Sequence, residues 1–374
     1  SVTTGLRNTI MGGLAGDALT IGNNNVVLGY NSLGSDTQGN NSVAIGNNTL
    51  ASQNFTSATD TLNVAVGYNA GLSITTGVQN TFVGALAGDA LTDADNNIAI
   101  GRSALSSDTL GSRSVAIGFQ ALRDQNFTSA TDTLNVAVGQ NAGLSITTGK
   151  QNTFIGALAG DGTDDGSSNT AVGYQALSGN AGNTNTAIGH ASLIACTGTD
   201  NTGIGEFSGF ELTSGGNNTF LGGDSGRTGS PGGAVTTGSN IICLGDENIS
   251  SFNCQVALTV ASDERDKTDF TDLDVGLDFV KQLKPYTYKW DKRSKYGDKT
   301  ADNYDLNAQT PDGTHKEDWL DVGFKAQEVE ALEQAAGYDK ANKTNLAVTI
   351  SEDGKQYGMQ YEKLIPILTK AIQE

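Results

Sequence analysis

A five-residue phrase recurs thirteen times within the first 222 residues and leaves little choice of fold. Each copy begins with asparagine or serine and closes with glycine, at Gly12, Gly29, Gly46, Gly67, Gly84, Gly101, Gly118, Gly139, Gly156, Gly173, Gly189, Gly205 and Gly222. Eight of the twelve steps between closing glycines are 17 residues, two are 21 and two are 16. A weaker copy closes at Gly245, 23 residues further on. A short fixed period of this kind predicts a solenoid, in which each repeat forms one coil.

The columns of the repeat predict what each coil contributes. Two positions before the glycine, a small or aromatic residue such as Ala44 or Phe82 stands between aliphatic neighbours, an alternation typical of a short strand with one inward face. The glycine allows a turn that a side chain would prevent. Three positions later stands Ala, Ser or Thr, which allows neighbouring backbones to approach closely. The asparagine column is expected to form an amide ladder from coil to coil. Fourteen stacked strands would make a parallel β-roll about 65 Å long.

The phrase NSVAIG at 41–46, with a small residue just beyond it, resembles the head repeat of trimeric autotransporter adhesins of the YadA type. The resemblance covers nearly all of residues 8–225. It implies an all-β, left-handed parallel β-roll and a homotrimer of three rolls around one axis. It leaves open a bacterial surface adhesin or a phage fibre, because both use such rolls.

A longer duplication repeats NFTSATDTLNVAVG at 54–67 and at 126–139. Each copy contains the four extra residues that lengthen one step from 17 to 21. We expect Asn54–Thr61 and Asn126–Thr133 to be loops that bulge from the same edge of the roll. We predict that Phe55 and Phe127 are exposed there and are candidates for contact with a receptor. The alternative is a capping loop that was copied together with its segment.

The character of the chain changes after about residue 250, where glycine becomes rarer and lysine, aspartate and aromatic residues become commoner. The pattern predicts helices at 272–284 and 325–336, a strand at 286–290, and a hairpin formed by 345–350 and 356–359. An apolar stripe at Tyr361, Leu364, Ile365, Leu368 and Ile372 predicts a C-terminal helix that starts or kinks near Pro366. Residues 291–320 are expected to form a long polar excursion.

The segment ASDERDK at 261–267 is the best candidate for chemistry. Ser262 is followed five residues later by Lys267, and a serine hydroxyl becomes a nucleophile only when a neighbouring base takes its proton. Lysine can act as that base only when it is neutral, which requires burial or a nearby cation such as Arg265. Taken alone, this spacing is weak evidence, because Ser and Lys five residues apart are common, and it favours a solvated, charged linker.

Four motifs resemble, in order, the intramolecular chaperone domain of phage tailspikes and tail fibres, an endosialidase-type self-cleaving serine peptidase. They are SDERDK, GLDFVKQLKPYTYKW at 276–290, GFKAQEV at 323–329 and YEKLIPILTKAIQE at 361–374. The resemblance implies a small α+β domain that trimerises its fibre and then releases it. It implies Ser262 as nucleophile, Lys267 as base and Asp263 as their acidic neighbour. The chain is therefore predicted to comprise a shaft at 1–250, a junction at 251–261 and a chaperone at 262–374.

Ring strain favours one cleavage site over another. Attack by the Ser262 hydroxyl on the preceding carbonyl passes through a five-membered ring, whereas attack on its own carbonyl would need a four-membered ring. Cleavage between Ala261 and Ser262 is therefore favoured over cleavage between Ser262 and Asp263, which stays open.

Composition excludes several other functions. The formal net charge is -19, so the chain has no basic field for a nucleic acid. Two histidines give no zinc spacing, and three cysteines, Cys196, Cys243 and Cys254, are too few for a disulfide scaffold. No apolar run is long enough to enter a membrane, and no cofactor or metal is expected.

These observations favour a phage tail-fibre segment, part of the virion tail and assembled in the host cytoplasm. Its partners would be two further copies of the chain and a host receptor, either a glycan or an outer-membrane component. A bacterial adhesin would need a signal peptide and a membrane barrel, and neither is present in the sequence. A glycan-degrading tailspike would need two placed carboxylates, for which Asp200, Glu206 and Glu211 can be considered.

Overall fold

The computed structural model describes residues 2–256, 258–299, 301 and 303–374. The chain divides into two compact units. Ser1–Ser225 and Thr236–Leu244 form the solenoid unit, and Gly226–Val235 and Gly245–Glu374 form the C-terminal unit. The ten-residue excursion that lengthens the last step of the repeat thus belongs to the C-terminal unit.

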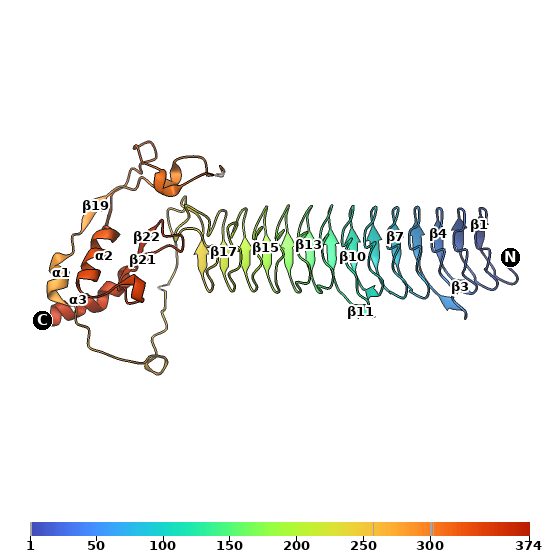
Figure 1. Ribbon diagram of the computed structural model, residues 1–374, viewed down its shortest axis with the longest axis horizontal. Helices are drawn as coiled ribbons and strands as arrows, with labels where there is room; N and C mark the ends of the chain where they lie inside the picture. Colours follow the sequence, from blue (N-terminus) through green and yellow to red (C-terminus); the bar gives the residue numbers. More distant parts are fainter. Residues whose placement is uncertain (1, 257, 300, 302) are drawn as a thin grey trace. The chain divides into compact units, whose positions relative to one another are not determined.

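The solenoid unit is built on one parallel sheet of fourteen three-residue strands (Figure 1). Each strand pairs with the next in register, so the central residues of the phrase, such as Ala44, Ala65 and Phe82, are direct neighbours. The predicted β-solenoid of stacked parallel coils is confirmed. The strands are β1 (Thr9–Met11), β2 (Val26–Leu28), β4 (Val43–Ile45), β6 (Val64–Val66), β7 (Thr81–Val83), β8 (Ile98–Ile100), β10 (Val115–Ile117), β12 (Val136–Val138), β13 (Thr153–Ile155), β14 (Thr170–Val172), β15 (Thr186–Ile188), β16 (Thr202–Ile204), β17 (Thr219–Leu221) and β18 (Ile242–Leu244).

The closing glycines stack against one another. Gly101, for example, has a φ of 131°, and an added Cβ would lie 2.3 Å from the carbonyl oxygen of Gly118 in the next coil. Only glycine fits a left-handed turn with a neighbouring backbone at that distance. This close contact explains why the glycine recurs in every coil.

The asparagine column forms the expected amide ladder. The side-chain oxygen of Asn152 accepts the backbone N–H of Asn169 at 2.9 Å, and its amide nitrogen donates to the carbonyl of Gly166 at 2.9 Å. Asn169 repeats the pattern toward Asn185 and Gly182. These side chains are buried, so each one satisfies backbone groups that water cannot reach.

The interior of the coils is filled in two alternative ways. Where the strand centre is alanine, the fourth residue after the glycine is usually a fully buried leucine, as with Ala116 and Leu122. Where the centre is Phe82, that fourth residue is glycine both in its own coil, at Gly88, and in the preceding coil, at Gly71. An added Cβ would lie 2.4 Å from the Phe82 ring at Gly88 and 2.7 Å from it at Gly71. One phenylalanine in these coils thus takes the space that leucine side chains fill in the alanine coils, so the filled core volume stays similar.

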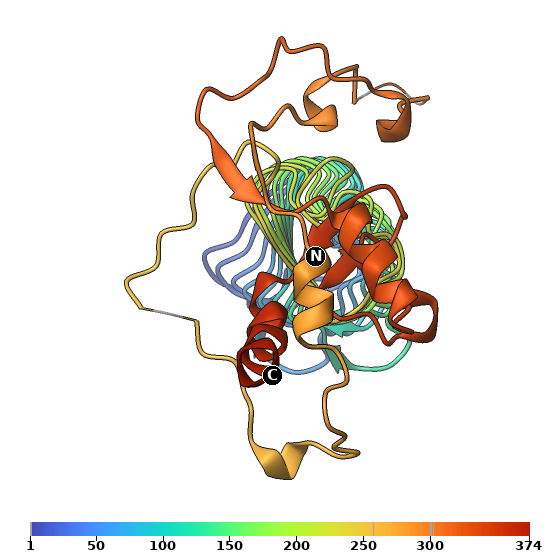
Figure 2. The same cartoon turned by 90° about the vertical axis from the view of Figure 1, so that its left-hand side faces the viewer.

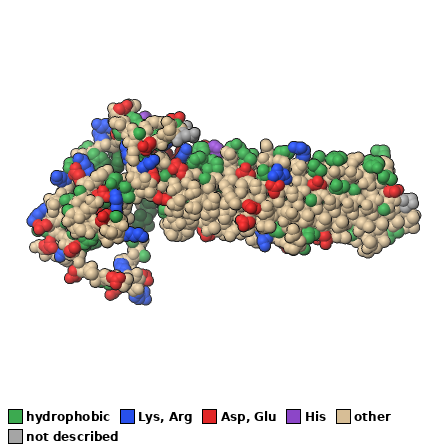
Figure 3. Space-filling view, viewed as in Figure 1, with side chains coloured by type: hydrophobic (Ala, Val, Ile, Leu, Met, Phe, Trp, Pro, Cys, Tyr) green, Lys and Arg blue, Asp and Glu red, His purple; other side chains and the backbone are tan. Residues whose placement is uncertain are grey.

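The outward face of the sheet carries an aliphatic column. The residue before the closing glycine is Val, Ile, Leu or Met in all fourteen strands. Many of these side chains are exposed in the single chain, among them Val83, Ile100, Ile155, Ile188, Ile204, Leu221 and Leu244. Charged side chains are sparse on the solenoid face in view and denser on the C-terminal unit (Figure 3).

The C-terminal unit combines the predicted helices and hairpin with a second small antiparallel sheet, whose strand β20 the sequence analysis did not predict. The helices are α1 (Leu277–Gln282), α2 (Ala326–Ala335) and α3 (Leu364–Gln373), and the sheets are β19 (Tyr286–Tyr288) with β20 (Asp321–Gly323) and β21 (Val348–Ile350) with β22 (Tyr357–Met359). One-turn 3₁₀ helices lie at η1 (Glu264–Asp266), η2 (Arg293–Lys295), η3 (Leu306–Ala308), η4 (Lys340–Asn342) and η5 (Tyr361–Lys363). Pro366 lies in the first turn of α3, where it costs no helical hydrogen bond.

The core of this unit is small. Val275, Phe279, Ala347, Leu364 and Ile367 form one buried cluster, which joins α1, α3 and the residue before β21. The buried carboxylate of Glu333, on α2, organises the backbone beside it. It accepts hydrogen bonds from the backbone N–H groups of residues 346, 347 and 348 at 3.1, 2.8 and 3.2 Å.

Candidate functional site

The turn η1 brings together the two residues predicted to carry the chemistry. Backbone N–H groups of Asp266 and Lys267 donate to the carbonyls of Asp263 and Glu264, which closes a tight turn directly after Ser262. As a result, Lys267 Nζ lies 2.6 Å from Ser262 Oγ and 3.3 Å from the Ser262 carbonyl oxygen. A hydroxyl and an amine at hydrogen-bond distance are the first geometric requirement for proton transfer.

Asp263 and Arg265 stabilise the turn. The Asp263 carboxylate accepts the backbone N–H of Arg265 at 2.9 Å and pairs with its guanidinium at 2.6 Å. This hydrogen-bonded guanidinium lowers the pKa of Asp263 below its ordinary value of 3.8. Arg265, which the sequence analysis considered as a cation near Lys267, pairs with Asp263.

The site is fully open to solvent in the single chain. Every described residue from Asn248 to Asp272 is exposed, and Figure 2 shows this segment as an extended thread interrupted by η1. Desolvation, one of the two ways to keep a lysine neutral, is therefore absent from one chain alone.

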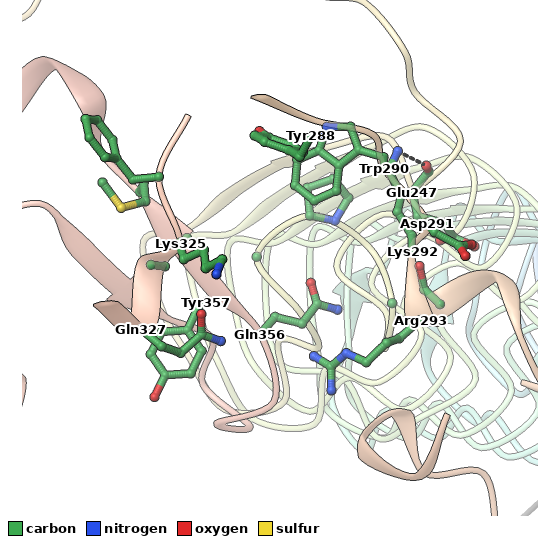
Figure 4. Close-up of a pocket in the computed structure, with 18 of the residues that line it drawn as sticks. Glu247, Tyr288, Trp290, Asp291, Lys292, Arg293, Lys325, Gln327, Gln356 and Tyr357 are labelled. Carbon is green, nitrogen blue, oxygen red and sulfur yellow. Dashed lines mark hydrogen bonds between the residues drawn. The ribbon is translucent and has the colours of Figure 1, made fainter. Parts of the chain in front are cut away.

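A cavity of about 900 Å³ in the C-terminal unit lies elsewhere, and neither Ser262 nor Lys267 lines it. Figure 4 shows Tyr288 and Trp290 together at one side of it and Gln327 and Tyr357 together at another. Other residues that line it include Glu247, Asp291, Lys292, Arg293, Phe324, Lys325 and Tyr361.

Residues that line this cavity contact Glu247, which precedes the predicted scissile bond in the sequence. Lys292 Nζ donates to the backbone oxygen of Glu247 at 2.9 Å (Figure 4). The buried Glu247 carboxylate also pairs with Lys299. The aromatic rings of Tyr288 and Trp290 meet edge to face with centroids 5.3 Å apart. The cavity is thus a structured part of the unit, and its chemistry does not involve the Ser262–Lys267 pair.

The prediction that Phe55 and Phe127 are exposed is wrong. Both side chains are only 7% exposed. Their backbone N–H groups donate to the buried carboxylates of Asp36 and Asp108 at 3.1 and 2.9 Å, which draws each phenylalanine into the coil. The exposed residues of each loop are instead the small ones at 56–58 and 128–130, together with Asn54, Asp60, Asn126 and Asp132.

The two insertion coils contain a buried polar network that the sequence analysis missed. In the first, Gln53 donates to Asp36 at 2.6 Å and to Ser42 at 3.1 Å and accepts from Asn63 at 2.9 Å. The second copy repeats these contacts with Asp108, Gln125, Ser114 and Asn135. Two short strand pairs close the loops, β3 (Gly39–Asn40) with β5 (Thr59–Asp60) and β9 (Gly111–Ser112) with β11 (Thr131–Asp132). The signal was present: serine replaces asparagine only in the coil that each insertion follows.

A strip of rings on the solenoid unit was also missed. Tyr174, His190 and Phe207 follow one another along successive coils, with ring centroids 5.6 and 4.8 Å apart, and Phe210 lies 5.4 Å from Phe207. His190 Nδ1 lies 3.1 Å from the Glu206 carboxylate. Glu206, considered above for glycan cleavage, is therefore the neighbour of a histidine in this strip.

Two searches of the described residues give negative results. No group of three or more His, Cys, Asp or Glu side chains among them could hold a metal ion. No helix in the described part is both long and apolar enough to cross a membrane.

Comparison with known proteins bears on the C-terminal part. Residues 262–338 match the family model described as chaperone of endosialidase, so the match begins at Ser262 itself. None of the curated proteins and none of the solved structures matches the chain. A β-solenoid followed by this domain fits the class of tail fibres that carry their own chaperone. Over residues 262–338 the C-terminal unit is therefore similar to the chaperone of endosialidase. That likeness indicates a serine-peptidase type of domain, and the endosialidase chaperone is linked to trimer assembly.

Proposed function

We propose that this chain is a segment of a phage tail fibre that binds a host surface as a homotrimer. In this proposal residues 1–250 are the shaft, 251–261 the junction and 262–374 a chaperone that drives trimerisation and then cleaves itself off. The observation that carries the proposal is the 2.6 Å contact between Lys267 Nζ and Ser262 Oγ, at the first residue of the family match.

The geometry supports an intramolecular acyl shift. Neutral Lys267 takes the proton of the Ser262 hydroxyl, and Oγ forms a bond to the carbonyl carbon of Ala261 through a five-membered ring. The bond from that carbon to the Ser262 nitrogen then breaks, and this nitrogen takes up a proton to become an amine. Water hydrolyses the resulting ester, which leaves a carboxylate on Ala261 and restores the hydroxyl. The reaction happens once in each chain.

The position of Lys267 also leaves cleavage between Ser262 and Asp263 as an alternative. Its 3.3 Å contact with the Ser262 carbonyl oxygen would polarise the bond between Ser262 and Asp263. That carbonyl cannot be reached by the hydroxyl of the same residue without a four-membered ring, so this alternative would need a hydroxyl from another copy. The amino-terminal residue of the released domain distinguishes the two, serine for the first bond and aspartate for the second.

Trimerisation is supported by an exposed seam at the C-terminus. Tyr361, Ile365, Leu368 and Ile372 are all exposed, and they follow one another at steps of four, three and four residues. This is the spacing of a coiled-coil seam, while Leu364 and Ile367 on the other face fill the core of the unit. The aliphatic column of the solenoid offers a second surface on which copies of the chain would pack.

A fibre built from near-identical coils gains from a removable clamp. Three rolls that start out of register by one repeat would lose little local contact, so a domain that trimerises first would fix the register. Cleavage afterwards would remove the domain that guides assembly, so a shaft that came apart could not easily reassemble, and the assembled shaft would be kinetically trapped. We place the protein in the virion tail, with assembly in the host cytoplasm and a surface glycan or outer-membrane component as its receptor.

Expression of the Ser262→Ala chain tests the proposal. Wild type is expected to give two fragments on denaturing electrophoresis, and Ser262→Ala and Lys267→Gln are each expected to give one intact chain. Ser251→Ala and Lys281→Gln are matched controls, since both residues lie outside the contact, and they should cleave like wild type. Fragmentation of Ser262→Ala near residue 261 would reject the dyad. Native mass measurement of the same samples reports the trimer.

A further inference from the structure

The segment just before the predicted scissile bond has the pattern of a strand that lacks a partner. Its apolar residues alternate strictly, at Phe252, Cys254, Val256, Leu258 and Val260. Four of these side chains are between 66% and 78% exposed, and Cys254 is also exposed. The intervening residues are polar or small, and Ala257 among them lies outside the described residues.

The backbone of this segment also makes no internal ladder. Among the described residues from Ser250 to Ala261, none takes part in a backbone hydrogen bond. Alternation with period two is typical of a strand with one covered face, and strand backbones need a ladder partner. A neutral, proline-free segment with high strand propensity would cause aggregation if it stayed exposed. The sequence therefore specifies a partner that one chain does not provide.

We propose that the segment from Phe252 to Val260 pairs with the same segment of two other copies, with the five apolar side chains facing the common axis. The inference rests on the homotrimer of the proposed function and names the surface that closes it. Charge favours this partner over others. The chain has a net charge of -19, yet no charged residue occurs between Glu247 and Asp263, so this is a place where like chains can approach without repulsion.

The position of the segment links assembly to cleavage. Ser262 follows Val260 by two residues, so three paired segments would bring three Ser262–Lys267 contacts to the end of one apolar bundle. There they would lose water, which is the condition that a lysine base needs and that a single chain lacks. After cleavage at Ala261 the bundle would stay on the shaft as its end.

Cross-linking of Cys254 tests the pairing without any need for cleavage. In the Ser262→Ala chain, mild oxidation is expected to join two Cys254 thiols in each trimer and leave the third chain single. The matched control carries Cys254→Ser and Thr259→Cys, which moves the thiol to the other face and should give far less covalent dimer. Cys196 and Cys243 are buried and are kept in both chains.

The outcomes separate this inference from the proposed function. A trimer in which Cys254 remains an exposed thiol and forms no cross-link overturns the inference alone. In that case the segment is free or awaits a foreign partner. A protected Cys254 that forms no cross-link also overturns the inference alone, because the segment would then pack on its own chain. A parent chain that stays monomeric overturns both proposals.

A charge placed on the apolar face provides a second test, in chains that keep Ser262. Val256→Asp would set three carboxylates against one another, and cleavage is expected to slow by at least about tenfold. Gln255→Asp adds the same charge on the opposite face and should cleave like wild type. The C-terminal seam is intact in both, so native mass should still show trimers. Equal cleavage of the two variants would overturn the inference.

Discussion

The solenoid unit and the junction that follows it use the same strand chemistry with opposite results. In the solenoid, each three-residue strand has a neighbour in the next coil, and its asparagine satisfies the backbone across the step. In the junction, a longer strand pattern from Phe252 to Val260 has no neighbour in the described chain and stays exposed. The difference teaches that a repeat supplies its own partner at a fixed step, whereas a sequence that occurs once has to find its partner elsewhere.

The largest change we expect comes from breaking the core of one coil. Gly88→Leu places a side chain where an added Cβ already lies 2.4 Å from the Phe82 ring, so the variant should lose about 3 kcal/mol of unfolding free energy. Thermal unfolding followed by circular dichroism measures it. Gly354→Ala is the control in the C-terminal unit, since its φ of 71° is similar but no atom lies within 4 Å. It should lose about 1 kcal/mol, the cost of a left-handed backbone alone.

A rescue sharpens this result. The triple variant Phe82→Ala, Gly88→Leu, Gly71→Leu converts the coil to the alanine and leucine core seen at Ala116 and Leu122. It should recover most of the stability that Gly88→Leu loses. A triple variant no more stable than Gly88→Leu would show that core volume is not what pairs phenylalanine with glycine.

A smaller loss is expected from the ladder. Asn152→Ala removes the acceptor of the Asn169 N–H and the donor to the Gly166 carbonyl, and both groups are buried. Leaving them unsatisfied should cost about 2 kcal/mol, read from the same unfolding curve. Asn47→Ala is the control, because this asparagine is exposed and its backbone is not left-handed. Equal losses for the two variants would contradict a structural role for the buried column.

The C-terminal unit should respond separately from the solenoid. Glu333→Gln replaces one carboxylate oxygen by an amide that cannot accept the N–H of Leu346, and we expect a loss of about 1.5 kcal/mol. The loss should appear in the melting of this unit while the solenoid transition stays in place, which differential scanning calorimetry resolves. Glu362→Gln is the exposed control. A shift of both transitions together would mean that the two units unfold as one.

Period and chemistry decided which of these features could be predicted from the sequence. The parallel coils, the amide ladder and the helices near 326 and 364 follow from local spacing, and the structure has them. The burial of Phe55 depends on Asp36, nineteen residues earlier, and on an insertion whose path no local pattern fixes. The contact of Lys267 with Ser262 depends on the turn between them, which the sequence suggested only through the resemblance. Contacts that recur with the repeat could be predicted from the sequence. Contacts that depend on the conformation of a loop or turn could not.

The smallest effect is expected at the turn that holds the dyad. Arg265→Gln removes the guanidinium that lowers the pKa of Asp263, and because this pair is exposed we expect cleavage to slow by less than about tenfold. Asp263→Asn is the companion variant, since it keeps an acceptor for the Arg265 N–H and loses only the charge.

A depressed carboxyl pKa stabilises the turn at every pH above its ordinary value of 3.8, and this stabilisation is lost as the pH falls through the depressed value. Between about pH 5 and pH 9 the pair therefore contributes a constant amount, and a rise of the cleavage rate with pH in that range would come from the group that takes the Ser262 proton. A rate that is flat across this range in wild type, measured by quantifying the two fragments over time, would argue against an amine as that base.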